Sequence, residues 1–213
     1  MVYTMKNSKE DSQIFNLNGE YARLDKFFEP PASTIIELDL GCGKGAFSTA
    51  LARKYPETMV FSVDVMIGRL RKLVKRKNRE NIANMFLLRG EASFFVTIML
   101  PDSSVDRLHI LFPDPWPKNK HRGNRLVSSE FLGQIHRVLK DGGVFHFATD
   151  DDSYYKSVTS IVGPSGIFRE EPSAISDLSD IKTDFERRWL EEDRAVNHMS
   201  WVKLPKVFRD TAH

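Results

Sequence analysis

The sequence predicts an α/β protein with a doubly wound, mostly parallel sheet and helices on both faces. Short runs rich in β-branched and aromatic residues alternate with amphipathic helical runs, which is the pattern of successive β-α-β units. A glycine-rich loop follows the first apolar run, as expected where a strand turns into a helix. With 213 residues, of which 41% are hydrophobic, the chain can bury a substantial core in one domain.

The first half of the chain supplies three strand–helix units. Three apolar runs have the length of strands, at residues 35–40, 59–63 and 85–88. Each is followed by a helical pattern, at residues 46–55, 66–78 and 93–99. Residues 1–33 are polar, and we expect this N-terminal tail to be loosely ordered.

The second half continues the same alternation. We predict a strand at 105–112, a helix at 128–139 that ends at the turn signal Asp141-Gly142-Gly143, and a strand at 144–148. A helix is expected at 152–162. Beyond Gly163 the pattern weakens through a polar stretch, and a helix-like segment at 183–194 and a strand candidate at 199–204 follow it.

Composition excludes several classes of protein. The apolar runs are far shorter than the roughly 18 residues of a membrane span, and no secretory signal pattern is present, so we expect a cytoplasmic protein.

Cys42 is the single cysteine, which excludes an intrachain disulfide framework, and we expect it to fill a loop rather than act as a nucleophile. The six histidines show no metal-ligand spacing, so no metal is expected, and His109 is interpreted as a core residue. The net charge of +2 decides nothing about nucleic acid, and no obligatory protein partner is evident.

The loop from Gly41 to Gly45 lies between the first strand and its helix. Its three glycines let the backbone approach a ligand and present helix N-terminal amides to it. The loop fits the dinucleotide pattern, and Asp64, at the end of the second strand, stands where a ribose-binding acid or a helix N-cap would stand. Two cofactors remain open, a nicotinamide dinucleotide and S-adenosylmethionine. Asp39 favours the second, because its carboxylate would attract an ammonium group and repel a pyrophosphate.

The run from Leu111 to Lys118, Leu-Phe-Pro-Asp-Pro-Trp-Pro-Lys, is the most informative segment of the chain. Its three prolines fix three φ angles and bias the residues before them to extended shapes. Asp114 and Trp116 are therefore aimed with little freedom, directly after an apolar strand. A carboxylate held in this way can grip a substrate, and Trp116 could either stack on a base or pack beneath the loop.

Ligands of doubly wound sheets bind beyond the carboxyl ends of the strands, where the strand order reverses. We expect the strands at 35–40 and 105–112 to flank that reversal, so that the glycine loop and the proline run face each other across one crevice. Acidic segments would line the crevice: Asp39, Asp64 and Glu91 on the cofactor side, Asp114 at the junction, and Thr149-Asp150 on the substrate side.

Two of these acidic segments carry an alternative interpretation. Glu91 could hydrogen-bond an adenine amino group or simply favour the N-terminus of the next short helix. Thr149-Asp150 could line the substrate side or cap the helix at 152–162.

The chain resembles the bacterial tRNA (guanine-N7-)-methyltransferase family in four segments: Asp39-Leu40-Gly41-Cys42-Gly43-Lys44-Gly45, Phe112-Pro113-Asp114-Pro115-Trp116-Pro117-Lys118, Ala148-Thr149-Asp150 and Thr183-Asp184-Phe185-Glu186. The resemblance covers residues 35 to 204, and the proline-tryptophan run with the later T-x-F-E motif is its specific part. It implies a Rossmann-like class I methyltransferase fold, with a single domain at residues 34–213.

The resemblance also implies a role for each matching residue. The residues that would contact S-adenosylmethionine are Asp39, Gly41, Gly43, Gly45, Asp64, Glu91 and Asp114. Asp114 would also be the catalytic acid. The residues that would contact the tRNA substrate are Lys118, Asp150, Thr183, Asp184, Phe185 and Glu186.

Two features bear on RNA binding. Gly123 and Asn124 stand where this family commonly has Lys and Arg, which weakens the expected binding of phosphate. A positive loop remains, formed by Lys118, Lys120, His121, Arg122 and Arg125. The helix at 66–78 presents a basic face, which could guide RNA electrostatically or be merely solvated.

Methyl transfer to guanine N7 requires no general base from the protein. N7 carries an in-plane lone pair and no proton, so the enzyme must hold it in line with the methyl group and exclude water. A carboxylate that accepts hydrogen bonds from guanine N1 and N2 would leave N7 free, and Asp114 or Asp150 could supply it. We therefore expect a tRNA methyltransferase that forms N7-methylguanosine from S-adenosylmethionine, in the variable loop by resemblance.

Two other functions remain open from the sequence. An NAD-dependent oxidoreductase would bind NAD and would not respond to S-adenosylhomocysteine, and Asp39 argues against it. A noncatalytic RNA-binding module on the same fold would bind tRNA without methyl transfer, and the retained acids argue against it.

Overall fold

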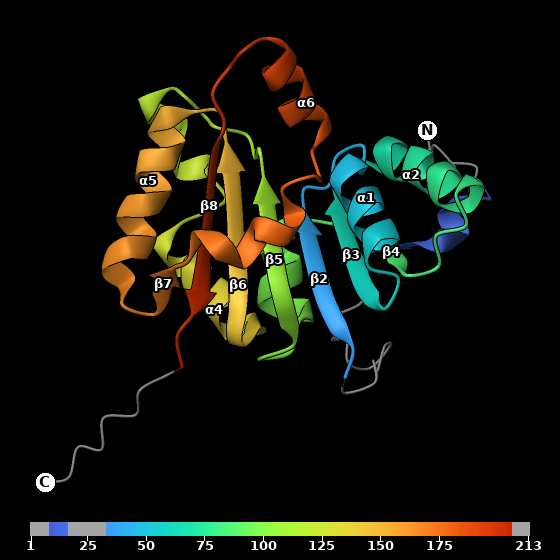
Figure 1. The fold of residues 1–213 in the computed structure, drawn as a ribbon, viewed down its shortest axis with the longest axis horizontal. Coiled ribbons are helices and arrows are strands. Elements are labelled where there is room, and N and C mark those ends of the chain that lie inside the picture. Colours follow the sequence, from blue (N-terminus) through green and yellow to red (C-terminus); the bar gives the residue numbers. More distant parts are fainter. Residues whose placement is uncertain (1–8, 17–32, 206–213) are drawn as a thin grey trace, which may run out of the picture.

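The computed structural model describes residues 9–16 and 33–205 of the chain. In this part of the chain, strands form one sheet in the order β1-β4-β3-β2-β5-β6-β8-β7 (Figure 1). β8 is antiparallel to both of its neighbours, and the other adjacent pairs are parallel. The predicted doubly wound, mostly parallel sheet is thereby confirmed.

The elements have the following bounds. The strands are β1 (Ile14–Asn16), β2 (Ile35–Leu40), β3 (Thr58–Asp64), β4 (Met85–Arg89), β5 (Val105–Leu111), β6 (Leu139–Thr149), β7 (Phe168–Glu170) and β8 (Asn197–Lys203). The α-helices are α1 (Ala46–Lys54), α2 (Ile67–Arg79), α3 (Ala92–Phe94), α4 (Ser129–Val138), α5 (Asp152–Val162) and α6 (Asp184–Glu191). Shorter turns are η1 (Asp11–Gln13), the π turn η3 (Phe95–Met99), η4 (Asn119–Asn124), η5 (Gly163–Ser165) and η6 (Pro172–Leu178).

The strand order reverses between β2 and β5, as predicted. β2 pairs with β3 on one side and with β5 on the other, with Asp39 opposite His109 in the second pair. The glycine loop after β2 and the proline run after β5 therefore leave the same edge of the sheet as neighbours. α6 stands beyond this edge in Figure 1.

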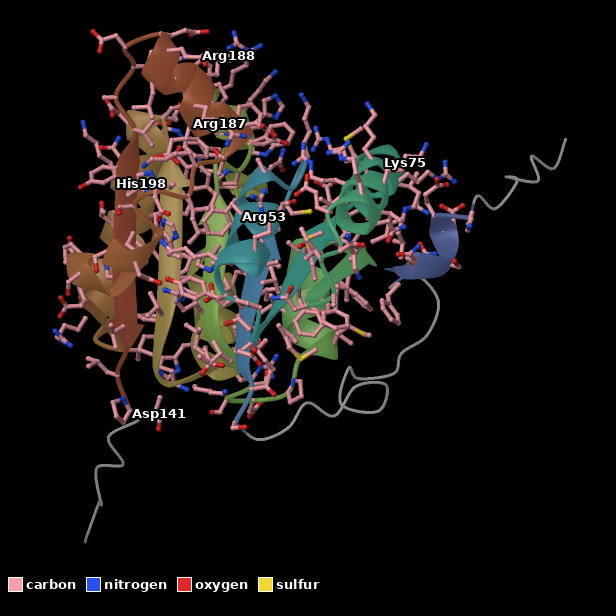
Figure 2. All side chains as sticks on the ribbon, turned by 45° about the vertical axis from the view of Figure 1, so that its right-hand side comes forward. Arg53, Lys75, Asp141, Arg187, Arg188 and His198 are labelled. Carbon is pink, nitrogen blue, oxygen red and sulfur yellow. The ribbon has the colours of Figure 1, made fainter. Side chains whose placement is uncertain are left out.

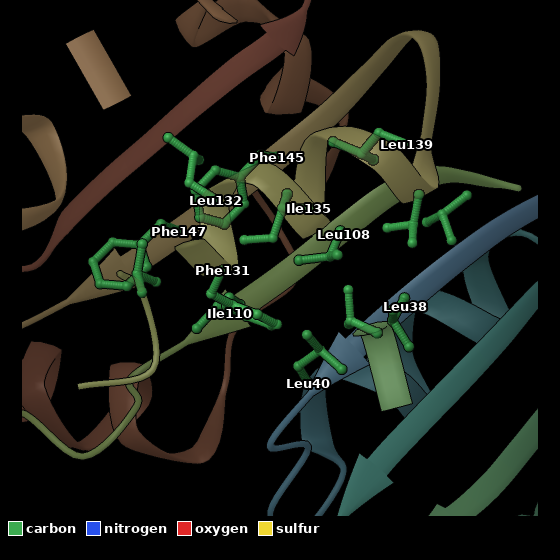
Figure 3. Close-up of a cluster of buried hydrophobic side chains, with 14 of the residues drawn as sticks. Leu38, Leu40, Leu108, Ile110, Phe131, Leu132, Ile135, Leu139, Phe145 and Phe147 are labelled. Carbon is green, nitrogen blue, oxygen red and sulfur yellow. The ribbon is translucent and has the colours of Figure 1, made fainter. Parts of the chain in front are cut away.

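One face of the sheet carries the larger apolar core. Leu38 and Leu40 from β2 and Leu108 and Ile110 from β5 point to this face, because alternate residues of a strand share a side. They pack with aromatic and aliphatic side chains of β6 and α4, as Figure 3 shows, and each of these four residues is at most 2% exposed. Helices α4 and α5 and the turn η3 cover this face.

The opposite face is covered by α1, α2 and the crossover that contains η6. Phe47 and Leu51 of α1, Leu70 and Leu73 of α2, and Leu178 of η6 are buried in a second cluster there. In Figure 1 the η6 segment (orange) crosses in front of the sheet between β6 and β2. This face also carries buried polar side chains, which the next subsection describes.

The N-terminal segment differs from its prediction in part. Residues 14–16 form β1, which pairs in parallel with β4, and Ile14 is buried against the second cluster. One buried isoleucine and an ion pair of Asp11 with Arg71 of α2 hold this short piece on the sheet edge. The rest of the predicted loose tail, residues 1–8 and 17–32, lies outside the described residues.

β6 starts earlier than predicted. α4 ends at Val138 and the strand begins at the next residue, so Asp141-Gly142-Gly143 lies inside β6 rather than between two elements. The pairing with β5 shifts register between Val105 and Arg107, and the left-handed φ of 77° at Gly142 accommodates that irregularity. β7 and η6, both within the polar stretch after Gly163, were not predicted.

No helix in the described ranges has the length and apolar character needed to cross a membrane.

Candidate functional site

The glycine loop is closed onto the end of β3. The amides of Gly41 and Cys42 both donate to the carbonyl of Val63, at 2.8 and 2.9 Å. Gly41, Gly43 and Gly45 all have left-handed φ values, of 77°, 57° and 70°. Gly45 is the N-cap of α1, and a Cβ placed on it would lie 2.5 Å from Leu73, so α2 packs directly against this backbone.

Asp39 is buried beside the glycine loop, with 3% of its surface exposed. Its Oδ2 accepts a hydrogen bond from the hydroxyl of Ser48 in α1. Burial, and to a lesser degree the charge of Asp64, raises the pKa of Asp39 to about 6, against the lowering effects of Ser48 and His109. In the part of the chain that is described, no lysine or arginine forms an ion pair with Asp39. Such a carboxylate is suited to a ligand that brings its own positive charge.

Asp64 ends β3 and ties three elements together. It accepts hydrogen bonds from the amide of Gly43 at 3.0 Å and from the amide of Met66 at 2.7 Å, and Arg69 lies 3.4 Å away. The N-cap of α2 is Met66, so Asp64 is not itself the N-cap that was the alternative to a ribose-binding role. Its carboxylate therefore links the glycine loop to the start of α2.

Cys42 has no sign of activation. Burial raises the pKa of its thiol well above the ordinary value, and the carboxylates of Asp39 and Asp64 add to the rise. A thiol that resists ionisation is a poor nucleophile, in agreement with the expected role of loop filler.

Glu91 follows β4 at the same edge of the sheet. It occupies the N-cap position of α3, but its side chain makes no capping hydrogen bond and is exposed. The exposed carboxylate is accessible to a ligand there.

The proline run leaves the sheet at a strained residue. Phe112 has a φ of 52°, and its amide donates to the carbonyl of Ala148 at 2.8 Å. Because of this left-handed conformation, β5 ends at Leu111, one residue earlier than predicted. Trp116 also has a left-handed φ, of 44°. Three residues precede prolines in this run, and the expectation that they are extended is wrong for Phe112 and Trp116. Each left-handed conformation costs about 1–3 kcal/mol. Asp114 lies exposed between them.

Arg125 anchors the proline run and does not belong to the exposed positive loop. Its side chain is 4% exposed, its Nε donates to the carbonyl of Pro115 at 2.8 Å, and its other nitrogens donate to Ser153 of α5. The guanidinium also lies 4.7 Å above the ring of Tyr154. The prediction that Arg125 contributes to a surface for phosphate is corrected, because its donors are turned inward.

The remaining residues of that loop are on the surface. Lys118, Lys120 and Arg122 are exposed. Trp116 is 38% exposed with its ring centroid 5.9 Å from that of His121, so it does not pack beneath the loop.

The sequence left open whether Thr149-Asp150 caps α5 or lines the substrate side. In the structure the neighbouring Asp151 caps the helix, since its Oδ1 accepts from the amide of Tyr154 at 2.7 Å. Thr149 is buried and its hydroxyl accepts from the amide of Asp151. Asp150 is left at the edge of the sheet, where its carboxylate pairs with Arg194 at 3.1 Å.

The T-x-F-E motif begins α6 above this edge. Thr183 is the N-cap, and its hydroxyl accepts from the amide of Glu186 at 2.9 Å. Asp184 pairs with Arg187 on the outer side of the helix. Phe185 is 52% exposed and stacks on Phe112, with ring centroids 6.2 Å apart, which brings the motif to the proline run.

Glu186 faces inward and is 3% exposed. Its Oε1 accepts from Lys182 at 2.7 Å and meets His198 of β8 at 3.0 Å. Burial raises the pKa of Glu186, but the hydrogen bonds and charges of His198 and Lys182 outweigh that effect and hold it below its ordinary value. The side chain of Glu186 is thus buried, whereas that of the preceding Phe185 is exposed and stacks on Phe112.

A cavity of about 260 Å³ lies next to Glu186, between the sheet and the crossover. Its polar lining includes Lys182, Glu186, His146 and His198. The apolar lining comes from α1, from the end of β5 and from η6, through Phe47, Leu111, Pro172, Ile175, Leu178 and Ile181. It is a mixed apolar and polar space of a size that suits a flat heterocycle.

The crossover over this cavity is fastened by ion pairs. Arg107 of β5 holds Asp177 of η6 with hydrogen bonds of 2.9 and 2.8 Å, and Tyr55 donates to the same carboxylate. Lys54 of α1 binds Asp180. The cover is therefore attached to both the sheet and α1.

The labelled basic side chains on α6 and α2 lie close to acids. Arg187 and Arg188 project from α6 and Lys75 from α2 in Figure 2, and the two arginines pair with Asp184 and Glu192. The α2 face is less positive than the sequence suggested, because Arg71 pairs with Asp11 and Lys75 lies 3.7 Å from Glu10. Its expected contact with RNA stays a prediction.

Sequence reasoning missed a row of polar side chains on the buried face under η6. Glu37 of β2, His109 of β5, His146 of β6 and His198 of β8 follow one another across adjacent strands. The signal was weak, since their strands carry other polar residues as well, such as Asp39 in β2 and Arg107 in β5. Only the strand register shows that they meet.

Three kinds of comparison place these residues in context. Residues 33–199 match the model of a family described as "Putative methyltransferase". A tRNA (guanine-N(7)-)-methyltransferase of Thermotoga maritima is 33% identical over 159 residues, which are 75% of this chain and 51% of that protein. The chain spans about half the length of this relative and of the one from Thermus thermophilus. Proteins of the same name from Corynebacterium efficiens and Neisseria gonorrhoeae are 32% and 34% identical, with 94% and 84% of this chain and 80% and 74% of those proteins covered.

Solved structures show the same fold. The 16S rRNA methyltransferase KamB has a TM-score of 0.58 at 20% identity, with 80% of this chain and 88% of that chain covered. A SAM-dependent methyltransferase from Aquifex aeolicus has a TM-score of 0.55 at 16% identity, with 85% and 87% covered. At these identities the likeness concerns the fold alone.

Proposed function

This chain belongs to the tRNA (guanine-N7-)-methyltransferase family, and on that premise we propose that it transfers a methyl group from S-adenosylmethionine to N7 of a guanosine in tRNA. The variable loop is the proposed target, by resemblance. The observation that carries the proposal is the meeting, at one edge of the sheet, of the glycine loop with its buried carboxylate and the proline run with α6.

The residues at the glycine loop fit the methyl donor. Asp39 is a buried carboxylate without a cationic side chain to balance it among the described residues, which matches the ammonium group of an amino-acid moiety. Asp64 ends β3 and Glu91 lies two residues after β4, and they would hold the ribose and the adenine. When bound, S-adenosylmethionine supplies an electrophilic methyl group on a sulfonium centre.

The protein's task in this reaction is orientation. Asp114 is exposed on a loop that is stiffened by three prolines and anchored by Arg125, and we assign it the junction between cofactor and substrate. A carboxylate there stabilises the positive charge that passes to the imidazole ring of guanine, without acting as a base. Phe185 and Phe112 form an apolar rim that excludes water from the same place.

The substrate side offers carboxylates for the far edge of the guanine. Asp150 and Glu186 both lie on this side, and either can accept hydrogen bonds from N1 and N2. Lys118 precedes η4, and Thr183 and Asp184 begin α6; we propose that these residues contact the tRNA. The positive surface that phosphates require would come from the exposed Lys118, Lys120 and Arg122, since Arg187 and Arg188 of α6 pair with Asp184 and Glu192. The cytoplasmic location stays a prediction.

The experiment is transfer of a labelled methyl group from S-adenosylmethionine to an unmodified tRNA transcript. Wild-type protein should label the transcript, and Asp114→Asn should lower kcat at least about a hundredfold, since it removes a charge at the reacting centre. The matched control is Asp141→Asn, an exposed acid in β6 at the far end of the sheet, which should keep wild-type rates. Wild-type turnover in Asp114→Asn would remove its assigned role. Binding of tRNA without any labelling would favour the noncatalytic module.

A further inference from the structure

Three histidines form a continuous hydrogen-bonded chain between two buried carboxylates. Glu37 Oε2 lies 2.8 Å from His109 Nε2, and His109 Nδ1 lies 3.1 Å from His146 Nδ1. His146 Nε2 lies 3.1 Å from His198 Nδ1, and His198 Nε2 lies 3.0 Å from Glu186 Oε1. The chain crosses β2, β5, β6 and β8 and ends on α6.

These four contacts need one proton more than neutral histidines carry. A neutral imidazole has one N–H donor and one bare acceptor nitrogen, and an ionised carboxylate only accepts. Three neutral histidines therefore bring three protons to four contacts, and one contact would set acceptor against acceptor. When all four hydrogen bonds form, the chain holds one additional proton.

The surroundings decide where that proton lies. Burial, followed by the charges of His109, His198, Arg107 and Lys182, holds the pKa of His146 well below its ordinary value, so the middle ring is neutral. The pKa values of Glu37 and Glu186 are also lowered: burial raises them, and their histidine and cationic partners outweigh it. The additional proton is therefore carried by His109 or His198.

The two outer positions are linked through the middle ring. If each hydrogen bond passes its proton along, the charge moves from His109 to His198 while the number of protons stays the same. Only the second end is accessible, because the side chain of His198 is 31% exposed and lines the cavity, whereas His109 is fully buried.

The other charged groups near the chain are fixed. Arg107 binds Glu37 and Asp177, Asp39 lies opposite His109, and Lys182 binds Glu186. Lys182 and His198 both use Oε1 of Glu186, and among the described residues no side chain donates to Oε2. One oxygen of this carboxylate is thus left for a ligand.

We propose that His198, at the accessible end of this chain, is a positioning residue for the reaction: its Nε2–H holds the carboxylate of Glu186 in place for the N1–H and N2–H of the target guanine. This inference rests on the proposed function, and it deepens that function by naming what selects the base. An ionised carboxylate accepts from guanine, whereas adenine presents a bare N1 that it would repel. The proton stays in the chain during methyl transfer, because N7 has none to release.

The inference predicts that the contact between His198 and Glu186 outlasts the additional proton. When that proton leaves, three protons remain for four contacts, and the hydrogen bonds to the two carboxylates are stronger than those between two rings, so a contact between two imidazoles is the one that is lost. A neutral His198 therefore still donates from Nε2 to Glu186.

Variants of His198 separate positioning from packing. His198→Gln places a permanent N–H donor near the position of Nε2, so it should keep kcat/KM within about threefold of wild type. His198→Leu should lower kcat/KM about tenfold or more at every pH. If His198 acts through Glu186, adding His198→Leu to Glu186→Gln should cost little more than Glu186→Gln alone. His136→Gln is the matched control, because His136 is a buried histidine outside the chain that bonds the carbonyl of Leu204.

A titration by nuclear magnetic resonance tests the proton count without any activity. In protein labelled with 15N in histidine, the ring nitrogens of His146 should be neutral near pH 7, and those of His109 and His198 should together show one imidazolium that is lost at higher pH. Three neutral rings at pH 7 would overturn the proton count, and methyl transfer that His198→Leu leaves unchanged would overturn the positioning role. If the additional proton is found and wild-type protein transfers no methyl group, the proposed function fails and the positioning role falls with it, whereas the proton count stands.

Discussion

At the scale of single residues, Asp39 makes cofactor binding depend on pH. Its pKa is raised from 3.8 to about 6, mainly by burial, so below pH 6 the folded protein holds it protonated. The folded state binds this proton more tightly than the unfolded chain, so ionising Asp39 lowers the free energy of unfolding as pH rises from 3.8 to 6. The ionised form is the one that attracts an ammonium group.

Binding of S-adenosylhomocysteine should therefore weaken below pH 6. We expect its Kd, measured by calorimetry, to rise about tenfold per pH unit as one proton competes with the ligand. Asp39→Asn should bind weakly and show no such slope. A wild-type Kd that is constant from pH 5 to pH 7 would contradict the role given to Asp39.

Arg125 and Lys118 should respond differently when each is changed to alanine. Arg125→Ala removes buried donors to Pro115 and Ser153, so it should lower the free energy of unfolding by about 1–3 kcal/mol and leave the salt dependence of tRNA binding unchanged. Lys118→Ala, at an exposed site, should keep stability within about 0.5 kcal/mol and lower the salt slope of binding by about 1.

Chemical denaturation and binding at several salt concentrations check this pair. An unchanged slope for Lys118→Ala would remove the loop from the RNA interface. A stable Arg125→Ala protein with a reduced slope would return Arg125 to the surface role that the sequence suggested.

At the scale of elements, Gly45 sets how closely α1 and α2 approach. Gly45→Ala combines a left-handed φ of 70° with a Cβ placed 2.5 Å from Leu73, so it should cost about 2 kcal/mol or more of unfolding free energy. Gly41→Ala has a similar φ of 77° but nothing within 4 Å of the added Cβ, and about 1–2 kcal/mol is expected. Urea unfolding should rank the two in this order. Equal losses would show that Leu73 moves aside freely.

The central strands and their helices were predictable because their apolar runs are bounded by clear turn residues. Strand 35–40 was placed correctly to the residue, and the helix at 152–162 likewise. β1 and β7 were missed because strands of three residues carry too little pattern. Asp141-Gly142-Gly143 was interpreted as a turn before a strand, but these residues lie within β6, where the pairing with β5 shifts register.

The parts of the site that lie in local sequence motifs were predictable. The predicted pairing of β2 with β5 is confirmed, and it makes the loops after these two strands neighbours. The inward turn of Arg125 and the row of histidines depend on partners tens of residues away in the chain, and a single sequence does not contain that register. The roles proposed for Asp39, Asp64, Glu91 and Asp114 toward the methyl donor stay predictions.

At the scale of the whole molecule, the sheet separates two kinds of interior. One face is an apolar core against α4 and α5, which makes the frame rigid. The other holds a polar row under a crossover that Arg107 and Lys54 fasten through Asp177 and Asp180. Both faces end at the carboxyl edge of the sheet, and α6 stands beyond this edge (Figure 1). This arrangement suits an enzyme that binds a large polyanion outside and a single base inside.

The most direct test of this account locates the methyl group on the RNA. A tRNA transcript treated with the protein and S-adenosylmethionine is reduced with borohydride and cleaved with aniline, which breaks the chain at N7-methylguanosine. The account predicts cleavage at one guanosine of the variable loop, and no cleavage after treatment with Asp114→Asn. Labelled RNA that resists cleavage would mean that another atom is methylated, which would contradict the proposed reaction.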